Sequence, residues 1–303
     1  MKSILALFLL ATSSLSLQAQ EQRPIWPAGK MPNTRGLVMR DSIVDGYAYL
    51  LKEPRLGIYP APKEKNTGTA VLIIPGGGYA RTQFDPDKIG LAKYFQSVGI
   101  NAFVVWYRLP ASADLLQPEL APLQDIQRAM RMIRAGAKEW GIDTARVGVF
   151  GTSAGGHGAT TLATHTADLS AIGDAADPYS YKPAFTILLS PVISFRDDIA
   201  HKGSRTRLLG KQPPAELIAA YSNETRVTRE TPPALLLHAQ DDKSVSPANS
   251  IVYYEALHKA GVPASLHIFP SGGHRLSIEY HPGSAALWPA LMLEWLRELK
   301  FLP

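Results

Sequence analysis

The stretch VFGTSAGG, which begins at Val149, places one serine among glycines where an apolar run ends. Ser153 has Gly151 two residues before it and Gly155 two residues after it, which completes a G-x-S-x-G pattern. In such a pattern the serine lies on a sharp turn between a strand and a helix, and small neighbours let backbone segments pass closely. The pattern predicts a serine hydroxyl exposed for nucleophilic attack, with a plain strand–helix turn as the alternative interpretation.

A serine hydroxyl needs a neighbouring base to accept its proton and a further group to orient that base. Asp241 and Asp242 follow the apolar run ALLLHA, at the carboxyl end of an expected strand. His274 follows the run LHIFP and two glycines, which give its loop the freedom to approach the serine. His281 is the rival base, but it lies farther from the strand end and directly before a proline. We therefore expect His274 to meet Ser153, with one of the two carboxylates orienting the imidazole.

A glycine cluster after an earlier apolar run supplies the hydrogen-bond donors that acyl transfer requires. The segment LIIPGGGYA contains Gly77 and Gly78. Their N–H groups, together with that of Ala154 at the start of the expected helix, are the predicted oxyanion donors. A phosphate-binding loop is the alternative, but no Lys-Ser or Lys-Thr pair follows and the spacing of a dinucleotide-binding motif is absent.

The elements that must position these residues alternate between apolar runs and segments of helical periodicity. The expected strands begin at Ala70, Ala102, Arg146, Phe185, Ala234 and Leu266. The expected helices span about 87–98, 122–140, 154–166, 246–260 and 284–299. Near-continuous apolar strands indicate a sheet that is covered on both faces, and the alternation indicates right-handed parallel crossovers. The sequence therefore predicts an α/β fold with a mostly parallel, doubly wound sheet and helices on both faces.

Two further segments are expected to lie outside this regular pattern. The region before residue 70 has proline and glycine breaks between short apolar stretches, which predicts antiparallel strands at the sheet edge. Residues 195–232 are polar, punctuated by proline and weakly periodic. We interpret 195–232 as an excursion over the sheet rather than as a second domain.

The N-terminus resembles a secretory signal. The segment MKSILALFLLATSSLSLQAQ places Lys2 before a short apolar run and ends in small residues, and we expect a signal peptide over residues 1–19. The apolar run is short and interrupted by polar residues, whereas a membrane anchor needs about 20 apolar residues. We therefore expect a single catalytic domain over residues 20–303, secreted or periplasmic and without a membrane anchor.

Charge and composition argue against other classes of partner. The formal net charge is +5, but lysines and arginines are scattered among 26 acidic residues, so nucleic acid is not an expected partner. Arg128, Arg131 and Arg134 recur at helical spacing, and we interpret them as a solvated helix face. The sequence has no cysteine, so an exported chain must be stable without disulfides. It has no H-E-x-x-H pattern, and neither a metal nor an organic cofactor is expected.

Six motifs together resemble those of the α/β-hydrolase superfamily, and more closely those of bacterial secreted acetylxylan and feruloyl esterase-like proteins. The resemblance covers the chain from about residue 66 onward and rests on AVLIIPGGGYA, GINAFVVWYRLP, DIQRAMRMIR, EWGIDTARVGVFGTSAGGH, HAQDDKSV and SGGH. Ser153, Asp242 and His274 follow the order nucleophile, acid, base that this superfamily uses. The D-x-x-V spacing that begins at Asp242 resembles the superfamily's acid loop and favours it over Asp241.

The resemblance implies a secreted serine esterase that removes acetyl or small aromatic acyl groups from plant-type polysaccharides or oligosaccharides, such as acetylated xylan, through an acyl-enzyme. The alternatives are a feruloyl esterase, a general short-chain esterase or lipase, a peptidase of the prolyl-oligopeptidase type, and a non-catalytic binding protein on the same scaffold. Pro75 stands where the hormone-sensitive-lipase group usually has histidine, so the chain departs from that group.

Several other side chains are expected to be structural rather than catalytic. Arg108, in the motif WYRLP, is expected to hold a loop by pairing with an acid such as Asp125. The aromatic side chains expected in the core, rather than against sugar rings, are Tyr79, Trp106 and Trp288. The histidines expected to be structural or surface residues are His157, His165, His201, His238, His258 and His267.

Overall fold

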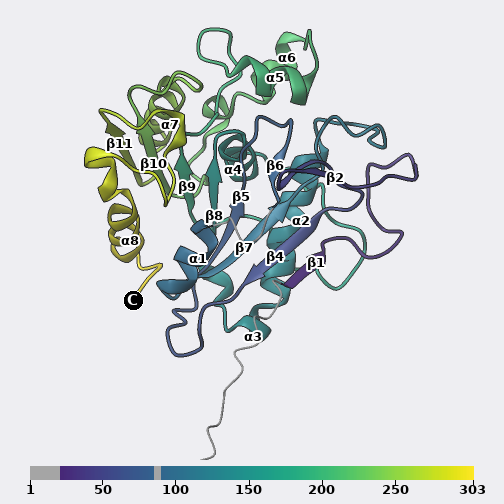
Figure 1. Ribbon diagram of the computed structural model, residues 1–303, viewed down its shortest axis with the longest axis horizontal. Helices are drawn as coiled ribbons and strands as arrows, with labels where there is room; N and C mark the ends of the chain where they lie inside the picture. The colour runs from purple at the N-terminus through teal and green to yellow at the C-terminus, as the bar shows by residue number, and fades with distance from the viewer. Residues whose placement is uncertain (1–20, 85–89) are drawn as a thin grey trace, which may run out of the picture.

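The computed structural model describes residues 21–84 and 90–303, so the signal peptide expected over residues 1–19 lies outside the described residues. Its central sheet has eight strands in the order β1-β4-β7-β5-β8-β9-β10-β11 (Figure 1). The strands are β1 (Glu21–Pro24), β4 (Arg55–Tyr59), β5 (Ala70–Ile74), β7 (Asn101–Trp106), β8 (Val147–Thr152), β9 (Thr186–Leu189), β10 (Ala234–Ala239) and β11 (Ala264–Phe269). β1 and β4 pair antiparallel at one edge, and the other six strands run parallel. The predicted mostly parallel sheet with N-terminal antiparallel edge strands is confirmed.

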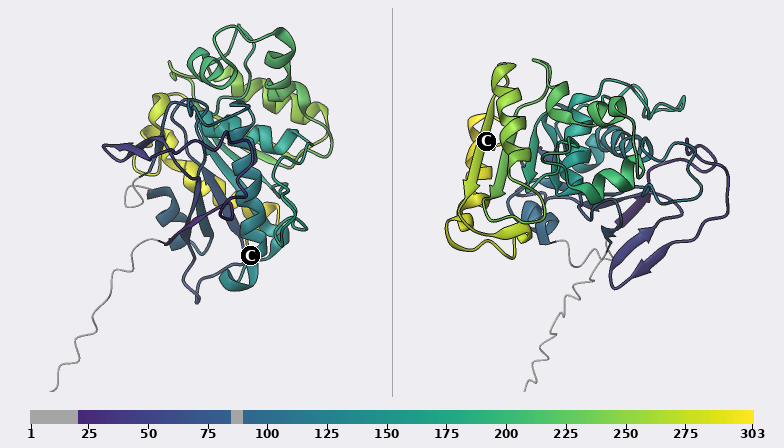
Figure 2. Two further views of the ribbon diagram at one scale, coloured as in Figure 1. Left: turned by 90° about the vertical axis from the view of Figure 1, so that its right-hand side faces the viewer. Right: turned by 90° about the horizontal axis from the view of Figure 1, so that it is seen from above.

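Helices cover both faces of this sheet (Figures 1 and 2). They are α1 (Gly90–Ser97), α2 (Ala121–Ala135), α3 (Ala137–Trp140), α4 (Ala154–Thr164), α5 (Lys202–Leu209), α6 (Ala215–Ala220), α7 (Ala248–Lys259) and α8 (Trp288–Glu298). The apolar sides of α2, α4 and α7 pack in one core cluster with alternate strand residues such as Leu72 and Ile74. α1 and α8 pack in a second cluster with Val71 and Ile73. Because both faces are covered, the inner strands β5, β7, β9 and β10 are buried along their whole length, and the predicted doubly wound α/β-hydrolase fold is confirmed.

The element boundaries differ modestly from those expected. The helix expected over 122–140 is divided into α2 and α3, and the one expected over 284–299 begins as the 3-10 turn Gly283–Leu287. The first residues of the helix expected over 87–98 lie outside the described residues. Other 3-10 turns span Thr144–Arg146, Asn223–Arg226 and Gly273–Arg275.

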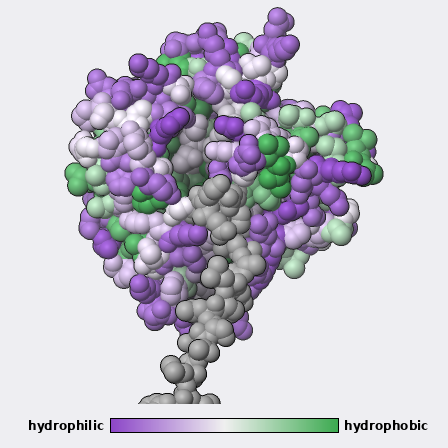
Figure 3. All heavy atoms as spheres, viewed as in Figure 1, coloured by the Kyte–Doolittle hydropathy of each residue, from purple (hydrophilic) through white to green (hydrophobic). Residues whose placement is uncertain are grey.

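In the described ranges no helix is long and apolar enough to cross a membrane. Hydrophilic side chains cover most of the face seen in Figure 3.

Two segments add structure that the sequence did not predict. In the N-terminal half, β2 (Ser42–Val44), β3 (Tyr47–Leu50) and β6 (Thr82–Gln83) form a separate three-stranded sheet. The excursion over 195–232 contains α5 and α6, which lie together at the top of Figure 1. Arg207 of α5 donates to Gly78 O at 3.3 Å. This excursion therefore contacts the glycine loop that follows β5.

The solvated face expected for Arg128, Arg131 and Arg134 is wrong, because these residues are only 3%, 4% and 7% exposed. The segment that follows α4 covers this side of α2. Arg128 binds Asp174, and Arg131 Nη2 lies 2.7 Å from a carboxylate oxygen of Asp168. Arg134 donates to backbone carbonyl oxygens of the same segment, and burial lowers its pKa to about 10. Helical spacing identified a shared face correctly, but a long loop rather than water covers that face.

Arg108 is structural, as predicted, and its partner is Asp125. The side chains are 2% and 0% exposed, and Arg108 Nη2 lies 2.8 Å from Asp125 Oδ1. Arg108 Nη1 donates to Pro32 O at 2.7 Å, and Trp26 Nε1 donates to Asp125 Oδ1 at 2.8 Å. This ion pair therefore joins the loop after β7, helix α2 and the N-terminal segment.

Replacing Arg108 with methionine is expected to lower the free energy of unfolding by about 3–5 kcal/mol, because Asp125 would keep a buried charge without its partner. Urea denaturation followed by circular dichroism measures this loss. The control is Arg229→Met at an exposed position, which should change stability by less than about 0.5 kcal/mol. A loss at Arg108 no larger than that at Arg229 would contradict the assignment.

Candidate active site

Ser153 lies at the turn between β8 and α4, the strand–turn–helix context that the G-x-S-x-G pattern requires. Its φ is +52°, a left-handed conformation that is uncommon for a residue with a side chain. A Cβ atom on Gly155 would lie 2.0 Å from Ile74 O, and one on Gly151 would lie 2.6 Å from Gly155 O. Because no Cβ atom fits at such distances, the two glycines allow α4 to pack directly against the strands and keep the turn sharp.

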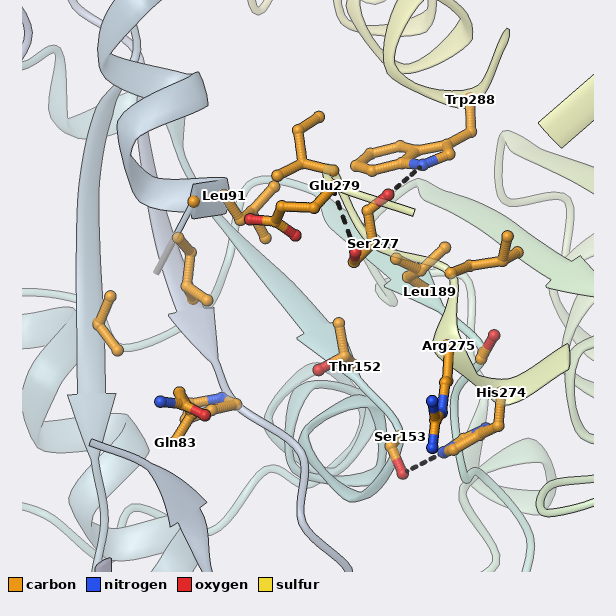
Figure 4. A pocket seen from close by; sticks show the side chains of 17 residues that line it. Gln83, Leu91, Thr152, Ser153, Leu189, His274, Arg275, Ser277, Glu279 and Trp288 are labelled. Atoms are coloured by element: carbon orange, nitrogen blue, oxygen red, sulfur yellow. Dashed lines mark hydrogen bonds between the residues drawn. The ribbon is translucent and has the colours of Figure 1, made fainter. Parts of the chain in front are cut away.

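The structure brings Ser153, His274 and Asp242 together from three separate loops. His274 lies in the 3-10 turn after β11, and Asp242 follows β10. His274 Nε2 lies 2.9 Å from Ser153 Oγ (Figure 4), and His274 Nδ1 lies 2.7 Å from Asp242 Oδ2. A carboxylate accepts the Nδ1–H, which leaves Nε2 free to accept the serine proton. The geometry is that of a hydroxyl, a base and a group that orients the base.

Asp242 is held by hydrogen bonds to both of its carboxylate oxygens. Oδ1 accepts from the backbone N–H groups of Ser244 at 2.8 Å and Val245 at 2.9 Å. Oδ2 lies 3.2 Å from Nε2 of His238 and also contacts His274. Burial alone would raise the pKa of Asp242, but hydrogen bonds from the two histidines and from Val245 N–H lower it well below its ordinary value. Asp242 is therefore ionised at neutral pH and can stabilise positive charge on the imidazole of His274.

The rival residues considered from the sequence have other partners. Asp241 Oδ1 accepts from the backbone N–H of Gly273 at 2.7 Å, so Asp241 holds the loop that carries His274. His281 Nδ1 lies 3.1 Å from Ser277 O, in the turn that follows. The two neighbouring aspartates thus have different tasks, one on the imidazole and one on the loop backbone.

Gly77 and Gly78 lie in the loop after β5, which passes directly beside Ser153. Their φ values are +126° and +63°, and a Cβ atom on Gly77 would lie 1.9 Å from a backbone oxygen of the same loop. A Cβ atom on Gly76 would lie 2.9 Å from Ser153 Cβ. Ala154 is the first residue of α4, where an N–H has no acceptor within the helix. The backbone segments that carry the predicted donors therefore meet at Ser153.

A cavity of about 390 Å³ opens beside Ser153 and His274 (Figure 4). Leu91 and Leu189 contribute apolar wall, and Gln83 and Glu279 add polar groups. The aromatic residues that were predicted to lie in the core are buried: Tyr79 is 2% exposed, and Trp106 and Trp288 are 0% exposed.

Across the part of the chain that the structure describes, no cluster of histidine and acidic side chains could hold a metal ion.

His238 contacts the loop that carries Asp242, which the sequence did not predict. It is fully buried on β10, with Nδ1 2.8 Å from Ser250 Oγ. Its Nε2 lies 3.1 Å from Val245 O and 3.2 Å from Asp242 Oδ2. Because a carbonyl oxygen only accepts, Nε2 carries the hydrogen. The available signal was its position on the strand that leads to Asp242, but strand periodicity does not reveal such a contact.

His157 is a second buried histidine whose contacts reach the site. Its Nε2 donates to Tyr221 O at 2.9 Å, which leaves Nδ1 to accept from Tyr79 OH at 2.9 Å. Tyr79 follows Gly78 in the glycine loop and has a φ of +58°. Complete burial lowers the pKa of His157 to about 3, so the neutral ring persists at neutral pH. The ring therefore joins the glycine loop to α4 and to the 195–232 excursion.

Because His157 is neutral in the folded protein, we expect the free energy of unfolding to depend on pH. In the unfolded chain the pKa of His157 is near 6.5. Between about pH 6.5 and pH 3 the unfolded chain therefore binds a proton at His157 that the native state does not bind. Stability is therefore full above pH 6.5 and falls as the pH is lowered towards 3, by up to about 1.4 kcal/mol per pH unit from this group.

The test is urea unfolding at several pH values, comparing the wild-type protein with His157→Gln. Glutamine keeps one donor and one acceptor but does not titrate, so the free energy of unfolding should fall less steeply with acid in this variant. Curves with equal slopes would rule out a neutral buried His157.

Comparison with known proteins adds to this geometry. The chain matches the BD-FAE family over residues 56–257. It is 36% identical over 215 residues to a Xylanibacter ruminicola protein named acetylxylan esterase, a match that covers 70% of this chain and 42% of that protein. It is 32% identical over 208 residues to endo-1,4-beta-xylanase B of Butyrivibrio fibrisolvens, covering 69% of this chain and 32% of that protein. The matched part is thus less than half the length of either curated relative.

A solved structure of similar sequence matches this chain over nearly the full length of both. The acetyl ester-xyloside bifunctional hydrolase from Caldicellulosiruptor lactoaceticus superposes with a TM-score of 0.79 at 33% identity. The match covers 94% of this chain and 98% of that one. The family match spans most of the central sheet, from β4 to α7, and includes Ser153 and Asp242. This chain belongs to the BD-FAE family and has the α/β-hydrolase fold.

Proposed function

We propose that this chain is a serine carboxylesterase that removes acyl groups, in the first place acetyl, from plant-type polysaccharides or oligosaccharides such as acetylated xylan. The observation that carries the proposal is the continuous contact from Ser153 Oγ to His274 Nε2 at 2.9 Å and from His274 Nδ1 to Asp242 at 2.7 Å. A protein that only bound its ligand would need neither this contact nor the glycine loop.

In the proposed mechanism, Ser153 Oγ attacks the ester carbonyl carbon while His274 Nε2 accepts the hydroxyl proton. The ionised Asp242 keeps the imidazole oriented and stabilises the positive charge that it gains. Collapse of the tetrahedral intermediate breaks the bond to the alcohol oxygen, which takes the proton from His274. Water then attacks the acyl-enzyme by the same route and releases the carboxylic acid.

Negative charge on the tetrahedral intermediate needs donors that are already in place. We assign this role to the backbone N–H groups of Gly77, Gly78 and Ala154, since their segments meet at Ser153. One such donor is typically worth about 3 kcal/mol of barrier. These donors must be held rigidly, and the hydrogen bond between Tyr79 OH and His157 Nδ1 helps to hold the glycine loop in place.

The substrate class rests on similarity and on the cavity. The relatives of known name include an acetylxylan esterase and an acetyl ester-xyloside hydrolase, which supports acetylated xylan-type carbohydrate. An aromatic acyl group such as feruloyl is the second candidate, because a cavity of about 390 Å³ with leucine walls exceeds the needs of an acetyl group. We also propose that residues 1–19 direct export, so that the enzyme meets its substrate outside the cytoplasm.

The experiment is an ester panel of acetylated xylooligosaccharides, feruloylated sugars, and short- and long-chain 4-nitrophenyl esters. The wild-type protein should release acetate, and Ser153→Ala and His274→Ala should each lose about 10⁴-fold or more in kcat. Asp242→Asn should lose about 10⁴-fold while it keeps the fold. Failure of the wild-type protein to hydrolyse any ester would overturn the proposal, and preference for long acyl chains would indicate a lipase.

The chain offers matched controls at the rival positions. Asp241→Asn keeps an acceptor for Gly273 N–H, and His281→Ala removes an imidazole that has no contact with Ser153 within the described residues. Both variants should retain most of the wild-type kcat. Equal losses at Asp241 and Asp242, or at His281 and His274, would show that the roles are assigned to the wrong members of each pair.

A further inference from the structure

A second space, an open groove of about 530 Å³, adjoins the cavity described above at His274. Its volume is within the range of about 300–1,000 Å³ that ligand pockets occupy. His274 and Arg275 line both the groove and the cavity, so the two spaces meet at the candidate base. Lys243 and Tyr280 also line the groove.

The proposed chemistry determines which part of an ester this groove faces. The alcohol oxygen of the ester takes its proton from His274 Nε2, so the alcohol must leave on the imidazole side of Ser153. Figure 4 shows Arg275 extending from the same turn toward the Ser153–His274 pair. Because the groove adjoins the cavity at His274, an alcohol that leaves past His274 has this groove beside it. In an acylated carbohydrate, that alcohol is the sugar.

The groove has two cationic side chains without protein partners. Arg275 and Lys243 are both exposed, and neither makes an ion pair or a side-chain hydrogen bond with any part of the chain that the structure describes. By contrast, Arg108 and Arg128 are buried against carboxylates. The one carboxylate in the groove is Asp241, which is engaged by Gly273 N–H. The groove thus carries an excess of positive charge and an arginine fork, the geometry that suits a carboxylate.

The groove also contains an exposed aromatic ring on a fixed backbone. Tyr280 is 51% exposed, yet its backbone is tied to Ser277 on both sides. Ser277 N–H donates to Tyr280 O at 2.8 Å, and Tyr280 N–H donates to Ser277 Oγ at 3.0 Å. Such a ring offers an apolar face with a polar rim, which matches the mixed surface of a sugar ring. The backbone that carries the ring is fixed before a ligand arrives, which lowers the entropic cost of ordering this segment on binding.

We propose that this groove binds the sugar chain of the substrate and selects chains that carry a carboxylate, that is, uronic acid residues near the ester. Arg275 and Lys243 bind the carboxylate, and Tyr280 packs against a sugar ring. The proposal rests on the proposed function for the position of the leaving alcohol. Beyond the esterase activity, a carboxylate on the substrate is recognised by Arg275 and Lys243.

The first test compares two acetylated xylooligosaccharides of equal length, one with a glucuronic acid branch and one without. For the wild-type protein, kcat/KM should be about tenfold higher for the acidic substrate, and the ratio should shrink as salt is raised. In Arg275→Gln the ratio should fall to near one, and in Lys243→Gln it should fall part of the way. Arg229→Gln, at an exposed position outside the groove, should keep the wild-type ratio.

The second test does not depend on catalysis. Calorimetry with Ser153→Ala should show tighter binding of the acidic, deacetylated oligosaccharide than of the neutral one, and Arg275→Gln in that background should remove the difference. Equal affinities, or a preference that survives Arg275→Gln, would overturn the proposal. If the wild-type protein hydrolyses 4-nitrophenyl acetate but shows no preference for the acidic chain in either test, this inference fails while the esterase assignment stands. If no ester is hydrolysed, the calorimetry still decides the groove.

Discussion

The close approach of three backbone segments at Ser153 is the constraint on which the site depends. Helix α4 packs so tightly on the ends of β5 and β8 that Gly155 would place a Cβ atom 2.0 Å from Ile74 O. This packing fixes the serine at a φ of +52°, with its hydroxyl directed towards His274. The strained turn at Ser153 is flanked by β5, which is fully buried, and by β8, which is buried except at Thr152, so its surroundings resist relaxation. The sheet therefore acts as the rigid support for a locally unfavourable turn.

Charged groups inside the molecule hold segments that are distant in the sequence in fixed positions. Arg108 with Asp125 and Arg128 with Asp174 connect loops that are distant in the sequence to the buried helix α2. Asp242 follows the same logic, since four donors saturate its carboxylate and keep its pKa low. Buried ions of this kind are costly when they lose a partner, so each pair allows few alternative arrangements.

Much of the fold and of the candidate site could be predicted because both follow from short-range patterns. Apolar runs that end in glycine or acidic residues located β5, β8 and β10 and the residues that follow them, and parallel strands bring such ends to one edge. The contacts of His238 and His157 were not predictable, because a single polar residue in an apolar run gives no sign of its partner. The arginines of α2 were misread for a related reason: helical spacing defines a face, but only the tertiary fold decides what covers it.

The ring of His157 stands between two parts of the chain with different freedom to change. On one side it meets Tyr79 of the glycine loop, and on the other the backbone at Tyr221, in the surface segment after β9. A change of length or sequence in that outer segment would shift an imidazole that braces the amides around Ser153. If the outer segment is exchanged to change substrate specificity, Tyr221 and its neighbours should therefore be kept. Otherwise the exchange will lower kcat through the displaced imidazole of His157.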